Sequence, residues 1–331
     1  MSKVYEKEHF PWEEGIRPST LNEFVGQPNI VNSLNIYIEA ARKRKEHLDH
    51  TILYGPPGLG KTTLAKIIAR ELGVSIKYLS GPAIEKQGDL ASILTTIKEN
   101  DMIFIDEIHR LHPSVEEILY SAMEDFHIDI IIGKGRGAKN VRLNLPKFTL
   151  VGATTRIGLL TNPLVSRFGI TLHVDYYGVK ELKRIILRSA KILKIRISDK
   201  TAEIIAERSR GTPRRANILL KRVRDVAEVK DIKFIEEEIA KEAFSILDID
   251  SEGLDELDRK ILLSIIKNFD GGPVGIKTLS SAVNEEKDTI EDVYEPFLIR
   301  KGFLRITSRG RVVTKRAYQH FNIKLFDGRL F

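Results

Sequence analysis

The chain has 331 residues, 42% hydrophobic and 30% charged, so it has enough apolar residues to build two or three domains with sizeable cores. It contains no cysteine, which excludes disulfides, thiolate metal sites and cysteine nucleophiles, and its net charge of +7 is only a weak sign of a polyanionic partner. No apolar run approaches the roughly 18 residues of a membrane helix, and the N-terminal MSKVYEKEHF is no signal peptide, so we expect a cytoplasmic protein without a membrane partner.

Residues 1–178 alternate short apolar runs with amphipathic helical patterns, which is typical of an α/β domain. The runs HTILYG, DMIFID and FTLVGAT are apolar without alternation, and this predicts buried parallel strands at 50–55, 101–106 and 148–154. The helical spacing of TTLAKIIARELG predicts a helix that ends at Gly73.

The segment GPPGLGKT, residues 55–62, fits the phosphate-loop pattern G-x-x-x-x-G-K-[ST] between a predicted strand and a predicted helix. Its glycines let backbone N–H groups crowd around phosphate oxygens, and the helix N-terminus adds partial positive charge. We expect Lys61 to reach the β and γ phosphates of ATP and the Thr62 hydroxyl to bind Mg²⁺. The predicted nucleotide contacts here are Gly55, Gly58, Gly60, Lys61, Thr62 and Thr63.

The run IFIDE, residues 103–107, places two carboxylates at a strand end. Asp106 is expected to hold the water shell of Mg²⁺, and Glu107 to polarise the attacking water. Alone, the run fits equally well an acidic strand end that caps the next helix. Paired with a phosphate loop, it favours nucleotide hydrolysis.

Between the second and third predicted strands, IDIII and VRLNL are expected to pair as a hairpin across GKGRGAKN. The run Ile130–Ile132 is too apolar for a free tip, so the hairpin packs either on its own domain or on a partner.

Residues 179–250 carry helical periodicity over 180–194, 200–210 and 213–230, with Thr212 as a plausible N-cap and Pro213 as the first helical residue. The acidic stretch DIDSEGLDELD, residues 248–258, is interpreted as a linker running into the next helix.

Residues 251–331 give a helix, a Gly-Gly-Pro turn, two helices and the hairpin FLRITSRGRVVT, an order that resembles a winged helix. From Arg300 to Lys324 there are eight Lys or Arg residues and no Asp or Glu. Arg305, Arg309 and Arg311 are therefore expected to grip DNA phosphates without reading sequence, although a solvated basic face is the alternative.

The motifs IRPSTLNEFVGQ, GPPGLGKTTLA, IFIDEIHRL, VGATTR, SRFGI and GTPRRAN occur in the order and spacing of an AAA+ ATPase. From about residue 14 to residue 321 the chain resembles the RuvB family of Holliday-junction branch-migration motors, and GGPVGIKTLSSAV and YEPFLIRKGF make this resemblance specific. It implies an AAA+ P-loop core with a parallel sheet over 1–178, a small all-α lid domain over 179–250 and a winged-helix domain over 251–331.

The resemblance also implies roles for single residues. Ile16, Arg17 and Tyr177 match adenine-side positions, with Tyr176 as the rival aromatic. Thr154 matches a sensor of the γ-phosphate, with Thr155 as its rival, and Arg214 matches a second sensor on the lid. Arg167 resembles an arginine finger that enters the neighbouring subunit's site, which demands a ring.

The partners implied are double-stranded DNA at four-way junctions, RuvA docked on the hairpin near Ile130–Ile132, the RuvC resolvase, and further copies of the chain in a homohexameric ring. Two positions depart from the family pattern, since Ile306 and Val165 stand where arginines are common. Arg305 could substitute for the first, but in a strand it would face the other side.

Two alternatives are a clamp-loader subunit and a nucleotide-gated replication initiator. Phe168 after Arg167 and the basic C-terminal segment count against the first, and the pair Glu107 and Arg167 counts against the second.

Overall fold

The structure is a computed structural model that describes residues 15–132 and 139–324. The chain divides into two compact units. The first takes in the residues up to Arg184 together with Thr212–Arg214, and the second takes in Ile185–Gly211 and the residues from Arg215 onward.

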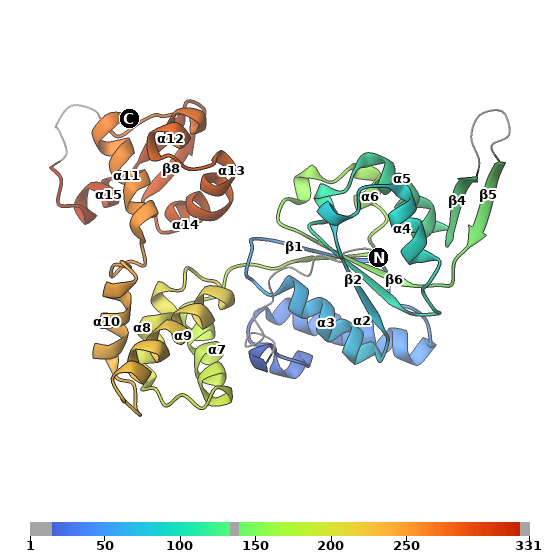
Figure 1. The fold of residues 1–331 in the computed structure, drawn as a ribbon, viewed down its shortest axis with the longest axis horizontal. Coiled ribbons are helices and arrows are strands. Elements are labelled where there is room, and N and C mark those ends of the chain that lie inside the picture. The colour runs from blue at the N-terminus through green and yellow to red at the C-terminus, as the bar shows by residue number, and fades with distance from the viewer. Residues whose placement is uncertain (1–14, 133–138, 325–331) are drawn as a thin grey trace. The chain divides into compact units, whose positions relative to one another are not determined.

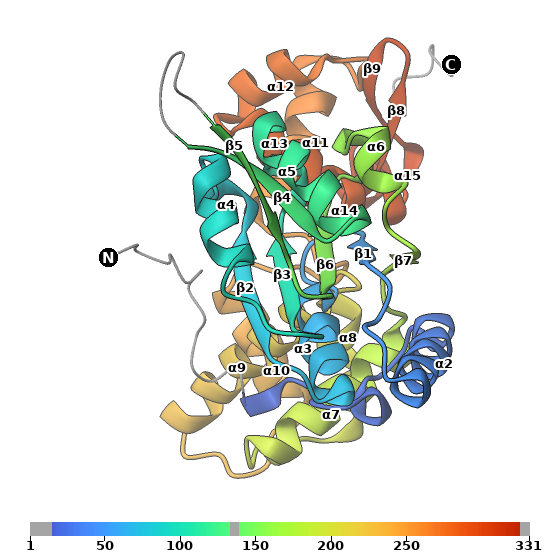
Figure 2. The same ribbon diagram turned by 90° about the vertical axis from the view of Figure 1, so that its right-hand side faces the viewer.

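The first unit is built on a five-stranded parallel sheet in the order β2-β3-β6-β1-β7, as Figure 2 shows. Its central strands are β1 (Thr51–Tyr54), β3 (Met102–Asp106) and β6 (Thr149–Thr154), which confirms the three predicted strands. The edge strands β2 (Ile76–Ser80) and β7 (Ile170–His173) were not predicted. Both are only partly buried, so neither has the continuous apolar run that identifies a central parallel strand.

Helices cover both faces of this sheet. In Figure 1, α2 (Pro28–Arg44) and α3 (Lys61–Leu72) lie on one face, and α4 (Gln87–Leu94), α5 (Pro113–Glu124) and α6 (Asn162–Val165) lie on the other. Helix α3 ends at Gly73, whose φ of 73° suits glycine, as predicted. Short 3₁₀ helices at Leu21–Glu23, Gly81–Ala83, Ile108–Arg110 and Ile157–Leu159 occupy the connections.

The predicted hairpin is present as an antiparallel pair, β4 (His127–Ile132) and β5 (Lys139–Asn144), in a sheet of its own. At its base Ile128 is buried and Ile130 packs against the core between the sheet and α5. Residues 133–138 and the side chains of Ile131 and Ile132 lie outside what the structure describes. The described part of the hairpin therefore packs on its own domain.

The second unit begins with four helices, α7 (Val179–Ile192, which starts in the first unit), α8 (Asp199–Arg208), α9 (Pro213–Val229) and α10 (Glu237–Ile246). The three predicted helices are confirmed, and α9 begins at Pro213. The C-terminal part contains α11 (Glu256–Asn268), α12 (Ile276–Val283), α13 (Lys287–Thr289), a π-helical turn (Ile290–Tyr294), α14 (Glu295–Arg300), β8 (Leu304–Thr307), β9 (Gly310–Val313) and α15 (Lys315–His320). Its core includes Leu262, Phe297 and Phe303. Within the described ranges, no helix is long and apolar enough to cross a membrane.

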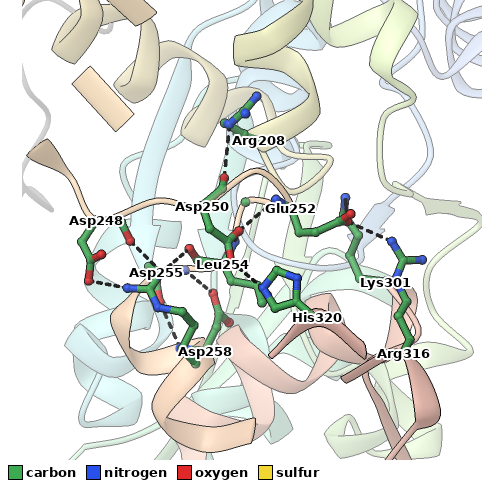
Figure 3. A network of polar contacts seen from close by, with 12 residues as sticks. Arg208, Asp248, Asp250, Glu252, Leu254, Asp255, Asp258, Lys301, Arg316 and His320 are labelled. Carbon is green, nitrogen blue, oxygen red and sulfur yellow. Dashed lines mark hydrogen bonds and ion pairs between the residues drawn. The ribbon is translucent and has the colours of Figure 1, made fainter. Parts of the chain in front are cut away.

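The acidic stretch 248–258 is not a plain linker, because its side chains build a polar network (Figure 3). Asp250 accepts hydrogen bonds from the backbone N–H groups of Glu252 and Leu254, and its other oxygen lies 2.8 Å from Nε2 of His320. Asp255 and Asp258 cap α11 reciprocally, and both carboxylates bind the buried guanidinium of Arg210. The stretch does run from the end of α10 into α11, as expected, but the contacts of its acidic side chains depend on residues such as Arg210 and His320 that only the fold brings near.

Candidate active site

The loop between β1 and α3 has the backbone that the glycine pattern predicts. Gly55, Gly58 and Gly60 have φ values of 141°, 78° and 101°, a region that favours glycine. At Gly55 a Cβ would lie 2.1 Å from the carbonyl oxygen of Val174, so a side chain is also excluded by space. The loop thus brings a run of backbone groups to the first turn of α3.

Lys61 opens α3 and is buried, with Nζ donating to the carbonyls of Gly55 at 2.6 Å and Pro56 at 2.9 Å. Gly60 is the N-cap and provides no side-chain cap, and the first N–H groups of a helix have no partner within it. Thr62 is half-buried and Thr63 is buried in the same turn. A buried ammonium beside a helix start and a glycine loop fits a polyphosphate.

Asp106 ends β3, and Glu107 follows with a left-handed φ of 52°. The N–H of Glu107 donates to Oδ1 of Asp106 at 3.0 Å. A Cβ at Gly81, which follows the neighbouring strand β2, would lie 2.4 Å from the carbonyl oxygen of Glu107. The backbone turn at Glu107 is therefore held by the hydrogen bond to Asp106 and by the close approach of Gly81, where there is no room for a side chain.

Both candidate sensor threonines lie at the end of β6. Thr154 is buried and pairs in register with Tyr54 of β1, next to the phosphate loop. Its Oγ1 accepts the N–H of Arg156 at 3.0 Å and lies 2.9 Å from Nδ1 of His109. Thr155 donates to Oε2 of Glu107 at 3.4 Å. The structure brings both threonines to the carboxylate, one directly and one through His109.

His109 and Phe24 were missed by the sequence analysis. The only signal for His109 was its place two residues after Glu107 at a strand end, and the ring of Phe24 lies against Gly60.

Of the two candidate tyrosines, Tyr177 is the one that reaches the loop. It is buried, and its hydroxyl donates to the carbonyl of Leu59 at 3.2 Å, whereas Tyr176 is only half-buried. Burial, with Glu181 nearby, raises the pKa of the Tyr177 phenol far above its usual value, so the hydroxyl stays protonated. Of the other predicted adenine contacts, Ile16 is buried and Arg17 half-buried.

Arg214 also lies at the loop. Its backbone N–H donates to the carbonyl of Gly58 at 3.3 Å, and a Cβ at Gly58 would lie 3.3 Å from Cβ of Arg214. The side chain is exposed, so its guanidinium is accessible.

Arg167 follows α6 and binds groups of its own chain. One guanidinium nitrogen donates to the carbonyl of Pro163 at 2.7 Å, and another donates to Oε2 of Glu124 at 2.6 Å. The guanidinium carbon lies 4.9 Å from the centroid of the Tyr120 ring, a cation–π distance. The structure gives this arginine a defined position on α5 and α6.

The wing arginines do not share one environment. Arg311 is 12% exposed, and its guanidinium binds Glu295 at 2.7 and 3.1 Å and Glu291 at 2.9 Å. The hydrogen bond to Glu295 raises the pKa of Arg311. Arg305 and Arg309 are exposed, as is Ile306, which lies opposite Arg311 in the register. The expectation that Arg311 grips phosphates differs from this picture, because its guanidinium is taken up by two carboxylates of its own domain.

Three family models together match most of the chain. Residues 16–174 match the Holliday junction DNA helicase RuvB P-loop domain, residues 177–250 the RuvB AAA lid domain, and residues 251–322 the RuvB C-terminal winged helix domain. Among solved structures, the Thermotoga maritima RuvB Holliday junction branch migration motor is 52% identical with a TM-score of 0.86, over 94% of this chain and 99% of that one. A single-residue variant of that protein matches at 52% identity and a TM-score of 0.87, over 93% of this chain and 99% of that one.

Proposed function

The chain belongs to the RuvB family, and on this premise we propose which of its residues carry each step of the work. The chain is an AAA+ P-loop ATPase and a motor for branch migration of Holliday junctions in recombination and repair. The phosphate loop, Glu107 and Thr154 lie together at the carboxyl ends of neighbouring strands, and this observation supports the assignment of residues.

ATP is the substrate, held by the N–H groups of the loop and by Lys61. The Thr62 hydroxyl and the Asp106 carboxylate match the oxygen ligands that Mg²⁺ takes beside phosphates, and the ion would neutralise charge on the leaving group. Tyr177, Ile16 and Arg17 form the adenine side, as the buried place of Tyr177 against the loop supports.

Glu107 accepts a proton from the water that attacks the γ-phosphorus, while the bond to the β–γ bridging oxygen breaks. Thr154 contacts the γ-phosphate, and Arg214 reaches the phosphates from the start of α9. The lid helices and the winged domain belong to one compact unit, so we propose that lid motion carries the winged domain with it.

Arg167 acts in trans in a homohexameric ring, where a finger of this kind is worth about 10³ to 10⁵ in rate. Arg309, assisted by Arg305, holds the phosphates of double-stranded DNA at the junction. RuvA docks on the β4–β5 hairpin near Ile130–Ile132, and RuvC joins for resolution, in the cytoplasm where the DNA lies.

The experiment is ATP turnover on a synthetic four-way junction against linear duplex of equal length, with and without a RuvA-type partner, and with Lys61→Ala as the inactive control. We expect the partner to stimulate turnover on the junction only, with strand exchange into two duplexes. Turnover that is equal on both DNAs, and the same with and without the partner, would contradict the proposal and favour clamp loading or replication initiation.

A further inference from the structure

His109 lies between the two groups to which the mechanism assigns separate roles. It follows Glu107 in the 3₁₀ turn Ile108–Arg110, and its side chain is 9% exposed. A single ring nitrogen, Nδ1, lies 2.9 Å from Oγ1 of Thr154 and 3.4 Å from Oε2 of Glu107. The ring thus bridges the end of β6 and the turn after β3.

The hydrogen-bond pattern indicates which way the proton points. Oγ1 of Thr154 already accepts the N–H of Arg156, and Oε2 of Glu107 is an acceptor when ionised. If Nδ1 carries hydrogen, it can donate to both oxygens in a three-centre bond. If Nδ1 carried a lone pair, that lone pair would face the carboxylate and repel it. The geometry therefore favours Nδ1–H shared between the hydroxyl and the carboxylate.

Among residues 15–132 and 139–324, the carboxylate of Glu107 has few other constraints. Its backbone N–H is held by Asp106, and within these ranges Oε2 is reached at the long distance of 3.4 Å by Thr155 and by His109. A carboxylate that orients water must keep its direction within a small angle, and side chains that touch it set that direction.

We propose that His109 is a positioning residue that aims the Glu107 carboxylate and links its orientation to Thr154. The inference rests on the proposed roles of Glu107 and Thr154. Through this bridge, a shift of the Thr154 hydroxyl on contact with the γ-phosphate moves the His109 ring, and with it the Nδ1 that lies 3.4 Å from the Glu107 carboxylate. His109 itself acts through Glu107 and does not contact the nucleotide.

The test uses the full chain with junction DNA and the RuvA-type partner, and compares His109→Ala, His109→Asn and His109→Gln. The amide nitrogen of Asn lies as many bonds from Cα as Nδ1 does, whereas that of Gln lies one bond farther. We expect the Ala and Gln variants to lose about 10- to 100-fold in kcat with KM for ATP nearly unchanged, a loss typical of an orienting group. The Asn variant recovers most of kcat.

The nearby exposed His112 gives the matched control, because it caps α5 and His112→Asn keeps a capping side chain. That variant leaves both constants unchanged. Equal kcat for His109→Asn and His109→Gln would overturn the inference, even if His109→Ala failed to fold.

The variant Glu107→Gln distinguishes a failure of the positioning role of His109 from a failure of the proposed role of Glu107 in hydrolysis. If Glu107→Gln is inactive while His109→Ala turns over like the parent, only the positioning role fails. If Glu107→Gln turns over like the parent, the proposed role of Glu107 fails and the inference falls with it. If both variants are slow, the double variant Glu107→Gln/His109→Ala should be no slower than Glu107→Gln, because the effects of residues that act as one unit are not additive. Additive losses in kcat would contradict the proposed link between His109 and Glu107.

Discussion

Arg309 and Arg311 stand two positions apart in the wing, yet their side chains meet different surroundings. Arg311 binds Glu295, whose side chain is 4% exposed, and Glu291, while Arg309 is exposed at the turn of the hairpin. A buried carboxylate that loses its only cation is costly, whereas an exposed arginine contributes little to folding. The carboxylates of its own domain therefore engage Arg311, whereas Arg309 is the exposed arginine on which the proposed DNA contact rests.

Arg311→Ala should lower the free energy of unfolding by about 3 to 5 kcal/mol, because it leaves Glu295 buried without its cation. Arg309→Ala should leave unfolding unchanged and reduce the salt dependence of duplex binding by about 0.9 in the log–log slope, the share of one phosphate contact. Denaturant unfolding and binding titrations at several salt concentrations check both. If Arg311→Ala instead changed only the salt-dependence slope of duplex binding and left the free energy of unfolding unchanged, the guanidinium of Arg311 would reach DNA.

Gly81 lies against the backbone of Asp106 and Glu107, the two carboxylate residues of the site. A Cβ there would lie 2.4 Å from the Glu107 carbonyl, so Gly81→Ala must displace the turn that aims the carboxylate. We expect kcat to fall by about tenfold or more with ATP binding retained, since a displacement of about 1 Å can cost 10²-fold. Gly88→Ala is the control, because nothing lies within 4 Å of its added Cβ. Unchanged kcat in Gly81→Ala would mean that the turn tolerates the shift.

At the scale of elements, the start of α11 carries two carboxylates around Arg210, the buried Asp258 and the half-buried Asp255. Burial raises the pKa of Asp258 to about 7 although Arg210 opposes this shift. Burial also acts to raise the pKa of Asp255, but Arg210, Arg215 and the hydrogen bonds with Asp258 together outweigh it and lower that pKa. Because Asp258 ordinarily titrates near 3.8, the folded chain holds its proton more tightly than the unfolded chain between these two pH values. Stability from this group is therefore greatest at low pH and falls as pH rises toward about 7.

Asp258→Asn mimics the protonated acid and should remove this dependence. Relative to the variant, the parent should lose unfolding free energy between pH of about 4 and 7, by up to about 1.4 kcal/mol per pH unit, and the difference should level off above that window. Denaturant unfolding across the window measures it. Glu256→Gln, an exposed change in the same helical turn, should show no such trend. A constant difference between parent and Asp258→Asn at every pH would refute the shifted titration.

The sequence predicts the central elements well because burial on both faces leaves a continuous apolar run, as in β1, β3 and β6. The edge strands β2 and β7 lack that signal, since each is covered only in part. The phosphate loop could be predicted because backbone and chemistry are encoded in one contiguous segment. The contacts of His109, Phe24 and Arg311 could not, because each depends on a residue that only the fold brings near.

At the scale of the assembly, a finger acting in trans has a consequence for mixed rings. Lys61→Ala removes the loop lysine but keeps Arg167, and Arg167→Ala does the reverse. Each alone should be inactive, while their mixture should regain part of the turnover, because some interfaces then combine an intact loop with an intact finger. Turnover against mixing ratio measures this. A mixture as inactive as its components would place Arg167 in the site of its own subunit.

The hairpin offers a second test at this scale. Figure 1 shows β4 and β5 standing apart from the five-stranded sheet. Ile128 and Ile130 of β4 pack against the core of the domain. Ile131→Asp should abolish capture of RuvA in a pull-down and leave basal ATP turnover intact. Asp129→Asn on the same strand, where Arg142 is the salt-bridge partner, is the control and should keep binding. Normal binding by folded Ile131→Asp would count against docking at this site.

The place of β1 in the sheet also sets an order of events during synthesis. Its neighbours among the described strands are β6 and β7, and β6 begins at Thr149, long after the phosphate loop has left the ribosome. At roughly 5 to 20 residues per second, the ribosome needs about 5 to 20 seconds to make the intervening stretch. Protease digestion of ribosome-bound chains of increasing length should protect α3 only once β6 has emerged. Until then the newborn chain has Lys61, Thr62, Asp106 and Glu107 but not the strands that flank β1, which makes this interval the one in which it most needs shelter from other unfolded chains.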